Sequence, residues 1–128
     1  MATRKRPSHP KTLARMCAEL MLEKKAHDVV MLDLRKLTDV TDFFVVCSAD
    51  SDTHLRAIAD SVLDGAAELG IKPYRTEGWQ GATWIILDFV EVVAHVFYKE
   101  TRDFYKIERL WGDAKVERVE DVAPAKAV

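Results

Sequence analysis

Apolar residues recur at helical spacing in two parts of the chain. The first predicted helix begins near Ser8, a candidate N-cap with Pro10 in the first turn, and runs to about Lys25. The second begins at Asp50 or Ser51 and ends at Gly70, a residue suited to the position after a helix. The apolar faces that define these helices are Leu13, Met16, Cys17, Leu20 and Met21 in the first, and Leu55, Ile58, Ala59, Val62, Ala66 and Leu69 in the second.

Compact runs of β-branched and aromatic residues between polar stretches predict five strands. Two runs, Asp28–Leu34 and Phe43–Cys47, read as buried strands separated by a polar loop. Ile71–Thr76 is a weaker run, and Pro73 places it at a sheet edge because proline cannot donate to a ladder. The remaining runs, Thr83–Phe89 and Val92–Tyr98, are joined by the short connection Val90-Glu91 and form a predicted hairpin.

The predicted elements follow one another in the order α-β-β-α-β-β-β-α, with a last short helix from Thr101 to about Trp111. This order predicts an α/β (α+β) sandwich, with a mixed sheet of about five strands and flanking helices. A chain of 128 residues fits one domain. We expect residues 1–8 to form a basic disordered tail, residues 9–112 a single domain, and residues 113–128 a frayed C-terminal tail.

Charge is distributed unevenly along the chain and bears on the kind of partner. The first fifteen residues carry five positive charges and no acid, whereas the remainder holds 14 basic and 21 acidic residues. An acidic body is a poor match for nucleic acid, so direct reading of nucleic acid is not expected. The basic arm is expected to be a solvated tail, with phosphate contact or a targeting role as alternatives.

The composition also bears on location. No apolar run approaches the roughly 20 residues of a membrane-spanning helix, and no secretory signal peptide is recognisable. Cys17 and Cys47 lie far apart inside apolar patterns, which favours buried reduced thiols. We therefore expect a cytoplasmic protein with no membrane contact.

A search for catalytic chemistry predicts neither a catalytic residue, a metal site nor a cofactor. The four histidines have no metal-type spacing, and His95 reads as a satisfied, partly buried strand residue. The glycines of Gly78-Trp79-Gln80-Gly81 neither follow a buried strand nor open a helix, so they do not read as a phosphate loop. Two alternatives remain open: convergence of carboxylates from Asp33, Asp42 and Asp88, or a triad built on Cys47.

The segment Thr83–Phe89 offers a candidate binding surface. With a period of two, Ile85, Leu87 and Phe89 share one face, and Trp84, Ile86 and Asp88 share the other. An apolar pair beside one carboxylate resembles a protein-binding surface with a polar rim. The alternative is that helices cover both faces of the sheet and Trp84 belongs to the core.

The last predicted helix offers further candidates. Phe104, Ile107 and Trp111 form a helical stripe that would cover one edge of the sheet. Arg102 and Tyr105 then lie on another face, and both residue types are enriched at interface hot spots. We expect these two residues to contact the partner, with an ordinary polar helix face as the alternative.

Several segments together resemble the ribosomal silencing factor (Iojap) family. They run in family order from about Lys25 to Asp113, and they are Asp42–Ser48, Glu77-Gly78, Trp84–Phe89, His95–Phe97, Arg102, Phe104-Tyr105 and Leu110–Asp113. This chain departs from the family pattern at three positions. Ala49 follows the second strand where the family usually has Gly, and Val90 and Glu91 replace Gly and Asp in the hairpin turn. Since Val tolerates positive φ poorly, the turn is expected to be longer or of another type.

The resemblance implies a fold related to nucleotidyltransferases without their catalytic site, and often a homodimer. It also implies binding to the large ribosomal subunit through the fourteenth large-subunit protein. Occupation of that surface would sterically block joining of the small subunit and repress translation when nutrients are scarce. The family would thus be regulatory and not enzymatic. Two alternatives remain: a nucleotide-acting enzyme of nucleotidyltransferase type, and an RNA-binding module.

Overall fold

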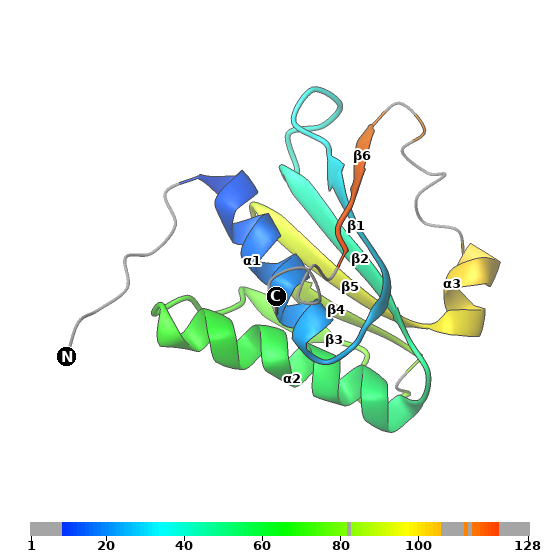
Figure 1. The fold of residues 1–128 in the computed structure, drawn as a ribbon. Coiled ribbons are helices and arrows are strands. Elements are labelled where there is room, and N and C mark those ends of the chain that lie inside the picture. Colours follow the sequence, from blue (N-terminus) through cyan, green and yellow to red (C-terminus); the bar gives the residue numbers. More distant parts are fainter. Residues whose placement is uncertain (1–8, 82, 106–111, 113, 121–128) are drawn as a thin grey trace, which may run out of the picture.

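A six-stranded mixed sheet with three helices forms the described part of the chain, which covers residues 9–81, 83–105, 112 and 114–120 in a computed structural model (Figure 1). Within these residues, no helix has the length and apolar character needed to cross a membrane. In chain order the elements are α1 (Pro10–Glu23), β1 (His27–Asp33), β2 (Phe43–Ala49), α2 (Asp52–Glu68), β3 (Arg75–Glu77), β4 (Trp84–Asp88), β5 (Val92–Tyr98), α3 (Lys99–Tyr105) and β6 (Lys115–Arg118).

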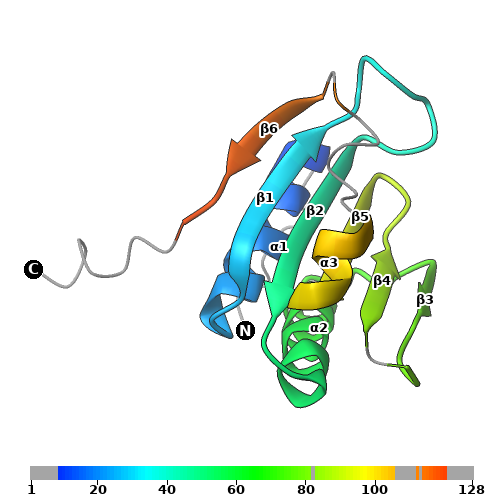
Figure 2. The same cartoon turned by 90° about the vertical axis from the view of Figure 1, so that its right-hand side faces the viewer.

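The strands lie in the order β3-β4-β5-β2-β1-β6 (Figure 2). The central pair β2 and β5 is parallel, and every other neighbouring pair is antiparallel. The mixed sheet and the flanking helices are confirmed, with six strands where the sequence predicts about five. β3 does lie at an edge, as Pro73 indicates.

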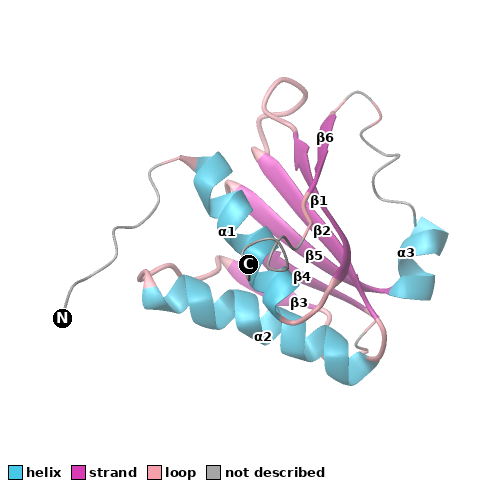
Figure 3. Ribbon diagram, viewed as in Figure 1, coloured by secondary structure: helices cyan, strands magenta, loops and turns pink. Residues whose placement is uncertain are grey.

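The two faces of the sheet are covered differently. Figure 3 shows α1 and α2 on one face, and the turned view in Figure 2 shows α3 in front of β2 and β5 on the other. The main core lies under α1 and α2 and receives alternate strand residues such as Val45, Ile85 and Val96. A smaller cluster lies on the opposite face: Val30, Leu32, Leu34, Val46 and Phe97, with Phe44, Trp84 and Ala114 packed against it.

The helix boundaries follow from local chemistry. The Ser51 side chain caps α2 by accepting a hydrogen bond from the His54 backbone N–H at 3.0 Å, and Gly70 follows the helix at φ +75°. The cap of α1 differs from expectation, because His9 occupies the N-cap position without a side-chain hydrogen bond. Ser8 and the rest of the expected basic tail lie outside the described residues.

The turn between β4 and β5 is of another type than the usual two-residue hairpin turn, as expected, but it is not longer. Val90 has φ +76°, and the Glu91 N–H donates to the Phe89 carbonyl at 3.0 Å, which makes a γ-turn centred on Val90. The Asp88 carboxylate accepts a hydrogen bond from the Val90 N–H at 2.8 Å. The connection therefore stays short, and a β-branched residue adopts a backbone conformation that glycine adopts more readily.

The segment expected to be a frayed C-terminal tail contains a strand. Residues 115–118 form β6, which pairs antiparallel with β1 and places Val116 opposite Leu32. Val119 follows it into the main core, and its N–H donates to the Val29 carbonyl at 2.8 Å. The alternating burial that reveals a strand is weak here, because three of the four residues of β6 are exposed.

Candidate functional site

The alternation predicted for β4 is confirmed. Ile85 and Leu87 are fully buried against the helices, whereas Trp84, Ile86 and Asp88 are half-buried on the opposite face. The β4–β5 register places Trp84 beside Phe97 and Ile86 beside His95. We call this surface, formed by Trp84, Ile86, Asp88, His95 and Phe97, the β4–β5 face.

Aromatic rings fill one end of the β4–β5 face. The Trp84 indole stacks on the Phe97 ring, with centroids 4.8 Å apart and an interplanar angle of 25°. The indole Nε1–H donates a hydrogen bond to His95 Nδ1 at 3.1 Å. Trp84 is thus packed against Phe97 and hydrogen-bonded to His95, while part of its surface stays exposed.

His95 is the buried titratable group of this face. Only 4% of the residue is exposed, and burial lowers the pKa of His95 to about 4, although the Asp88 carboxylate opposes this shift. Phe44 on β2 makes an edge-on contact with the imidazole at a centroid distance of 4.4 Å. The imidazole is therefore neutral near pH 7 and able to accept the indole hydrogen bond.

Charged residues border the other end of the β4–β5 face. Arg75 on the edge strand β3 pairs with Asp88, with Nε 3.5 Å from a carboxylate oxygen, and also with Glu77 at 2.9 Å. The β3–β4 register places Arg75 opposite Asp88 and Glu77 opposite Ile86, so all four share this side of the sheet. An apolar centre with a charged rim is typical of protein interfaces.

The loop between β3 and β4 packs directly against the backbone of Trp84. Gly78 has φ +94°, and a Cβ added there would overlap the Trp84 carbonyl oxygen. Trp79 is held in the same loop by a hydrogen bond from its Nε1–H to the Thr76 hydroxyl at 3.0 Å, and its carbonyl accepts hydrogen bonds from Arg56. The start of β4 is therefore fixed by direct backbone contact.

Arg102 does not lie where the sequence predicts. The helical pattern places it on the exposed face of the last helix, but it is 8% exposed, and its guanidinium donates to the Asp28 carbonyl at 2.6 Å and to the Ser48 hydroxyl at 3.0 Å. Arg102 therefore fastens α3 to β1 and β2, and the exposed position expected for it is wrong. Tyr105 is the last residue of α3, and its side chain lies outside the described residues, as do Ile107 and Trp111.

The three carboxylates considered for catalysis do not form one cluster, because Asp33 and Asp42 both lie near Arg35 whereas Asp88 lies apart from them. Asp33 is held by Arg35 through two side-chain hydrogen bonds, which lower the pKa of Asp33 to about 2, and Asp88 lies on β4, across β5 and β2. Burial raises the pKa of Cys17 and of Cys47 to about 12, so neither thiol is activated. In the described ranges, no three His, Cys, Asp or Glu side chains are grouped to hold a metal ion.

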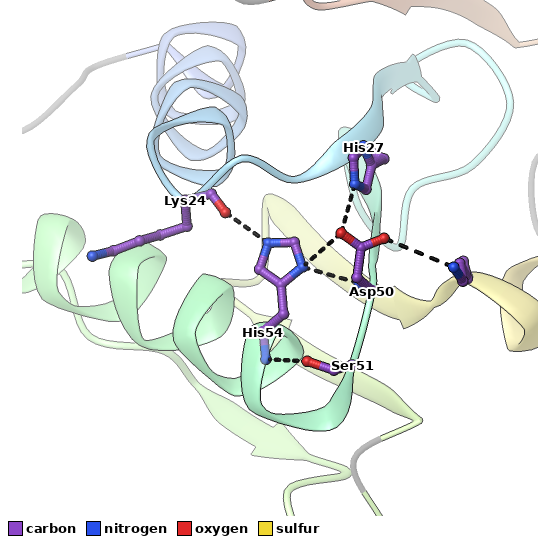
Figure 4. Close-up of polar contacts among 6 residues, drawn as sticks. Lys24, His27, Asp50, Ser51 and His54 are labelled. Carbon is purple, nitrogen blue, oxygen red and sulfur yellow. Dashed lines mark hydrogen bonds and ion pairs between the residues drawn. The ribbon is translucent and has the colours of Figure 1, made fainter.

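A polar cluster that the sequence does not reveal lies where β2 ends and β1 begins (Figure 4). The Asp50 carboxylate contacts His27 Nε2 at 2.9 Å, and this hydrogen bond is the main cause that lowers the pKa of Asp50. His54 accepts from the Asp50 N–H at 2.9 Å and donates to the Lys24 carbonyl at 2.7 Å. The cluster ties the ends of α1 and β2 to the starts of β1 and α2, which is a structural role.

The chain combines a mixed α+β fold with an aromatic strand face bordered by charged residues, an arrangement that is common at protein interfaces. Residues 7–128 match the family described as "Ribosomal silencing factor during starvation". The chain belongs to the ribosomal silencing factor family.

Individual relatives agree with this assignment. The ribosomal silencing factor RsfS of Bacillus subtilis is 38% identical over 104 residues, which cover 81% of this chain and 88% of that protein. The chloroplastic protein Iojap of Zea mays is 32% identical over 97 residues, 76% of this chain and 42% of that protein. A crystal structure of a Chromobacterium violaceum protein superposes with a TM-score of 0.79 at 30% identity, and the match covers 90% of this chain and 96% of the other. Membership of this family places the chain among ribosome-associated regulators of translation, which are regulatory and not catalytic proteins.

Proposed function

We propose that this protein binds the large ribosomal subunit through the fourteenth large-subunit protein and sterically blocks joining of the small subunit. The observation that carries the proposal is the β4–β5 face, where Trp84 and Ile86 are half-buried beside the Asp88–Arg75 ion pair. Nothing in this mechanism requires a bond to be made or broken, because an occupied joining surface is enough to repress translation in the cytoplasm.

The charge of the chain supports a protein partner over ribosomal RNA. Residues 16–128 carry 14 basic and 21 acidic side chains, and phosphate binding depends on clustered cations. A contact made by an indole and an aliphatic side chain depends little on salt. Binding that instead falls steeply as salt rises would favour the RNA-binding alternative.

Trp84→Ala tests the proposal by co-sedimentation with purified large subunits on sucrose gradients. Truncating an aromatic anchor at an interface centre costs about 2 kcal/mol or more, so binding should weaken at least about thirty-fold. Tyr74→Ala is the matched control, because Tyr74 is an aromatic residue that is 75% exposed outside the β4–β5 face. The parent protein should also be absent from joined ribosomes.

Trp84 packs on Phe97, so the truncation also lowers stability, and circular dichroism must show that the variant is folded at the assay temperature. Ile86→Ala repeats the test with a smaller loss of packing. If both variants are folded and co-sediment like the parent, the β4–β5 face is not the binding surface. Three further expectations stay predictions: contact of Tyr105 with the partner, the homodimer, and the relationship to nucleotidyltransferases. Light scattering of the parent protein would measure whether it forms a homodimer.

A further inference from the structure

His95 is an unusual choice of residue for its position. It lies in the middle of β5 with its ring enclosed by three aromatic side chains, Phe44 at a centroid distance of 4.4 Å, Trp84 at 6.0 Å and Phe97 at 6.2 Å. Surroundings of this kind suit an apolar ring. Among the described residues, the hydrogen bond from Trp84 Nε1–H to Nδ1 is the one polar contact of the imidazole.

That hydrogen bond determines where the imidazole carries its proton. Since Nδ1 accepts from the indole, the neutral ring is protonated at Nε2. Nε2 is buried and has no hydrogen-bond partner in the described part of the chain. A buried donor without an acceptor destabilises the fold, so a phenyl ring would pack here at lower cost. What histidine supplies and phenylalanine cannot is an acceptor for the Trp84 indole.

We propose that His95 is a positioning residue, which holds the Trp84 indole in one orientation on the β4–β5 face. The inference rests on the proposed function, because it assigns a role in preparing Trp84 for the partner. Stacking on Phe97 fixes the plane of the indole but not which of its edges turns toward solvent. The bond to His95 directs the N–H edge of the indole toward β5, so the carbocyclic edge points away from His95.

The orientation also specifies the kind of surface that the partner presents. Because the indole N–H already donates to His95, the partner needs an apolar pocket for the ring and not a hydrogen-bond acceptor. Fixing the side chain before binding also reduces the conformational entropy lost on association. Burial keeps the pKa of His95 at about 4, so Nδ1 remains an acceptor throughout the neutral range.

Two substitutions separate positioning from packing. His95→Phe keeps an aromatic ring and removes the acceptor. His95→Asn places an amide oxygen on the same Cγ that carries Nδ1 and therefore restores an acceptor at that point. We expect His95→Phe to melt at the same or a higher temperature than the parent, yet to bind large subunits about five- to tenfold more weakly, the value of one hydrogen bond. His95→Asn should bind more tightly than His95→Phe despite its poorer packing.

The orientation of the indole is read independently of binding. The chain has three tryptophans, so a ¹H–¹⁵N spectrum contains three indole resonances, and the Trp84 signal is assigned with Trp84→Phe. Loss of the acceptor in His95→Phe should move that indole proton upfield, and His95→Asn should move it back. If His95→Phe does not fold, His95→Leu provides a second acceptor-free variant with the same two measurements.

Each outcome bears on one hypothesis. An unchanged Trp84 indole resonance in His95→Phe would overturn the inference, because the hydrogen bond would not exist in solution. A shifted resonance with parental binding would also overturn it, since orientation would not matter to the partner. When Trp84→Ala weakens binding and His95→Phe does not, only the positioning role fails. When neither variant weakens binding, the proposed function of the β4–β5 face fails as well.

Discussion

Substitution of Gly78 by alanine tests how the β3–β4 loop supports Trp84. Gly78 has φ +94°, and an added Cβ would overlap the Trp84 carbonyl oxygen and lie 3.1 Å from the Ile85 Cα. Gly70 offers a matched control, because it has a similar φ of +75° but a Cβ added there would meet nothing within 4 Å. The two alanine variants therefore share the backbone cost of a positive φ and differ in the steric overlap.

The expected magnitudes follow from these two contributions. An L-residue in the left-handed region costs about 1–2 kcal/mol, and the lower entropy of the unfolded alanine chain offsets part of it, which leaves about 1 kcal/mol for Gly70→Ala. Forcing an extra carbon into a packed backbone contact adds about 1–3 kcal/mol, so Gly78→Ala should lose about 2–4 kcal/mol. For a chain of this size, 1 kcal/mol shifts Tm by about 4 °C.

Urea denaturation followed by circular dichroism measures both variants, and co-sedimentation measures binding to large subunits. Gly78→Ala should be the less stable variant and should also bind more weakly, because its backbone must move where Trp84 begins β4. Gly70→Ala should bind like the parent. Equal losses of stability in the two variants would show that Gly78 does not contact the Trp84 backbone in solution, and the account of how the loop fixes β4 would be wrong.

Three further substitutions or conditions give direct tests. Arg102→Ala should lower the free energy of unfolding by about 2–4 kcal/mol in urea denaturation, because it leaves the Asp28 carbonyl and the Ser48 hydroxyl without this donor. An unchanged Tm would instead support the surface role expected from the sequence. Val90→Gly should raise stability by about 1 kcal/mol in the same assay by relieving the positive φ, and a loss would refute the γ-turn. The free energy of unfolding should fall by about 3 kcal/mol as the pH drops from about 6.5 to about 4, because the histidine of the unfolded chain binds a proton that buried His95 does not. His95→Phe should lack this pH dependence.

The periodic parts of the sequence predict the fold well because burial imposes a period. β5 spans the predicted residues Val92–Tyr98, and the alternation in β4 separates Trp84, Ile86 and Asp88 from the core. The sequence does not predict β6, because an edge strand is held by backbone hydrogen bonds and buries few side chains. Lys115–Arg118 accordingly carries no clear alternation of apolar and polar residues.

Residues that depend on long-range geometry are not predictable in the same way. An arginine on an amphipathic helix is normally assigned to solvent, but Arg102 reaches a carbonyl freed where β1 bulges, at Asp28 with φ +51°. The predicted hairpin already brings His95 close to Trp84, but the hydrogen bond between their side chains depends on rotamers that the pattern does not specify. The contacts of Asp50 with His27 and His54 likewise join elements whose proximity exists only in the fold.

The pairing of β6 with β1 has a consequence for how the chain is made. Leu32 is synthesised early, yet its neighbour across the sheet edge, Val116, is added only after most of the chain. Until then, the outer edge of β1 presents unpaired N–H and C=O groups beside the apolar side chains of Val30, Met31 and Leu32. Such an edge recruits strands from other chains. A nascent or prematurely terminated chain that stops before Lys115 is therefore expected to aggregate, and completion of the last strand is what protects the protein against pairing with its own copies.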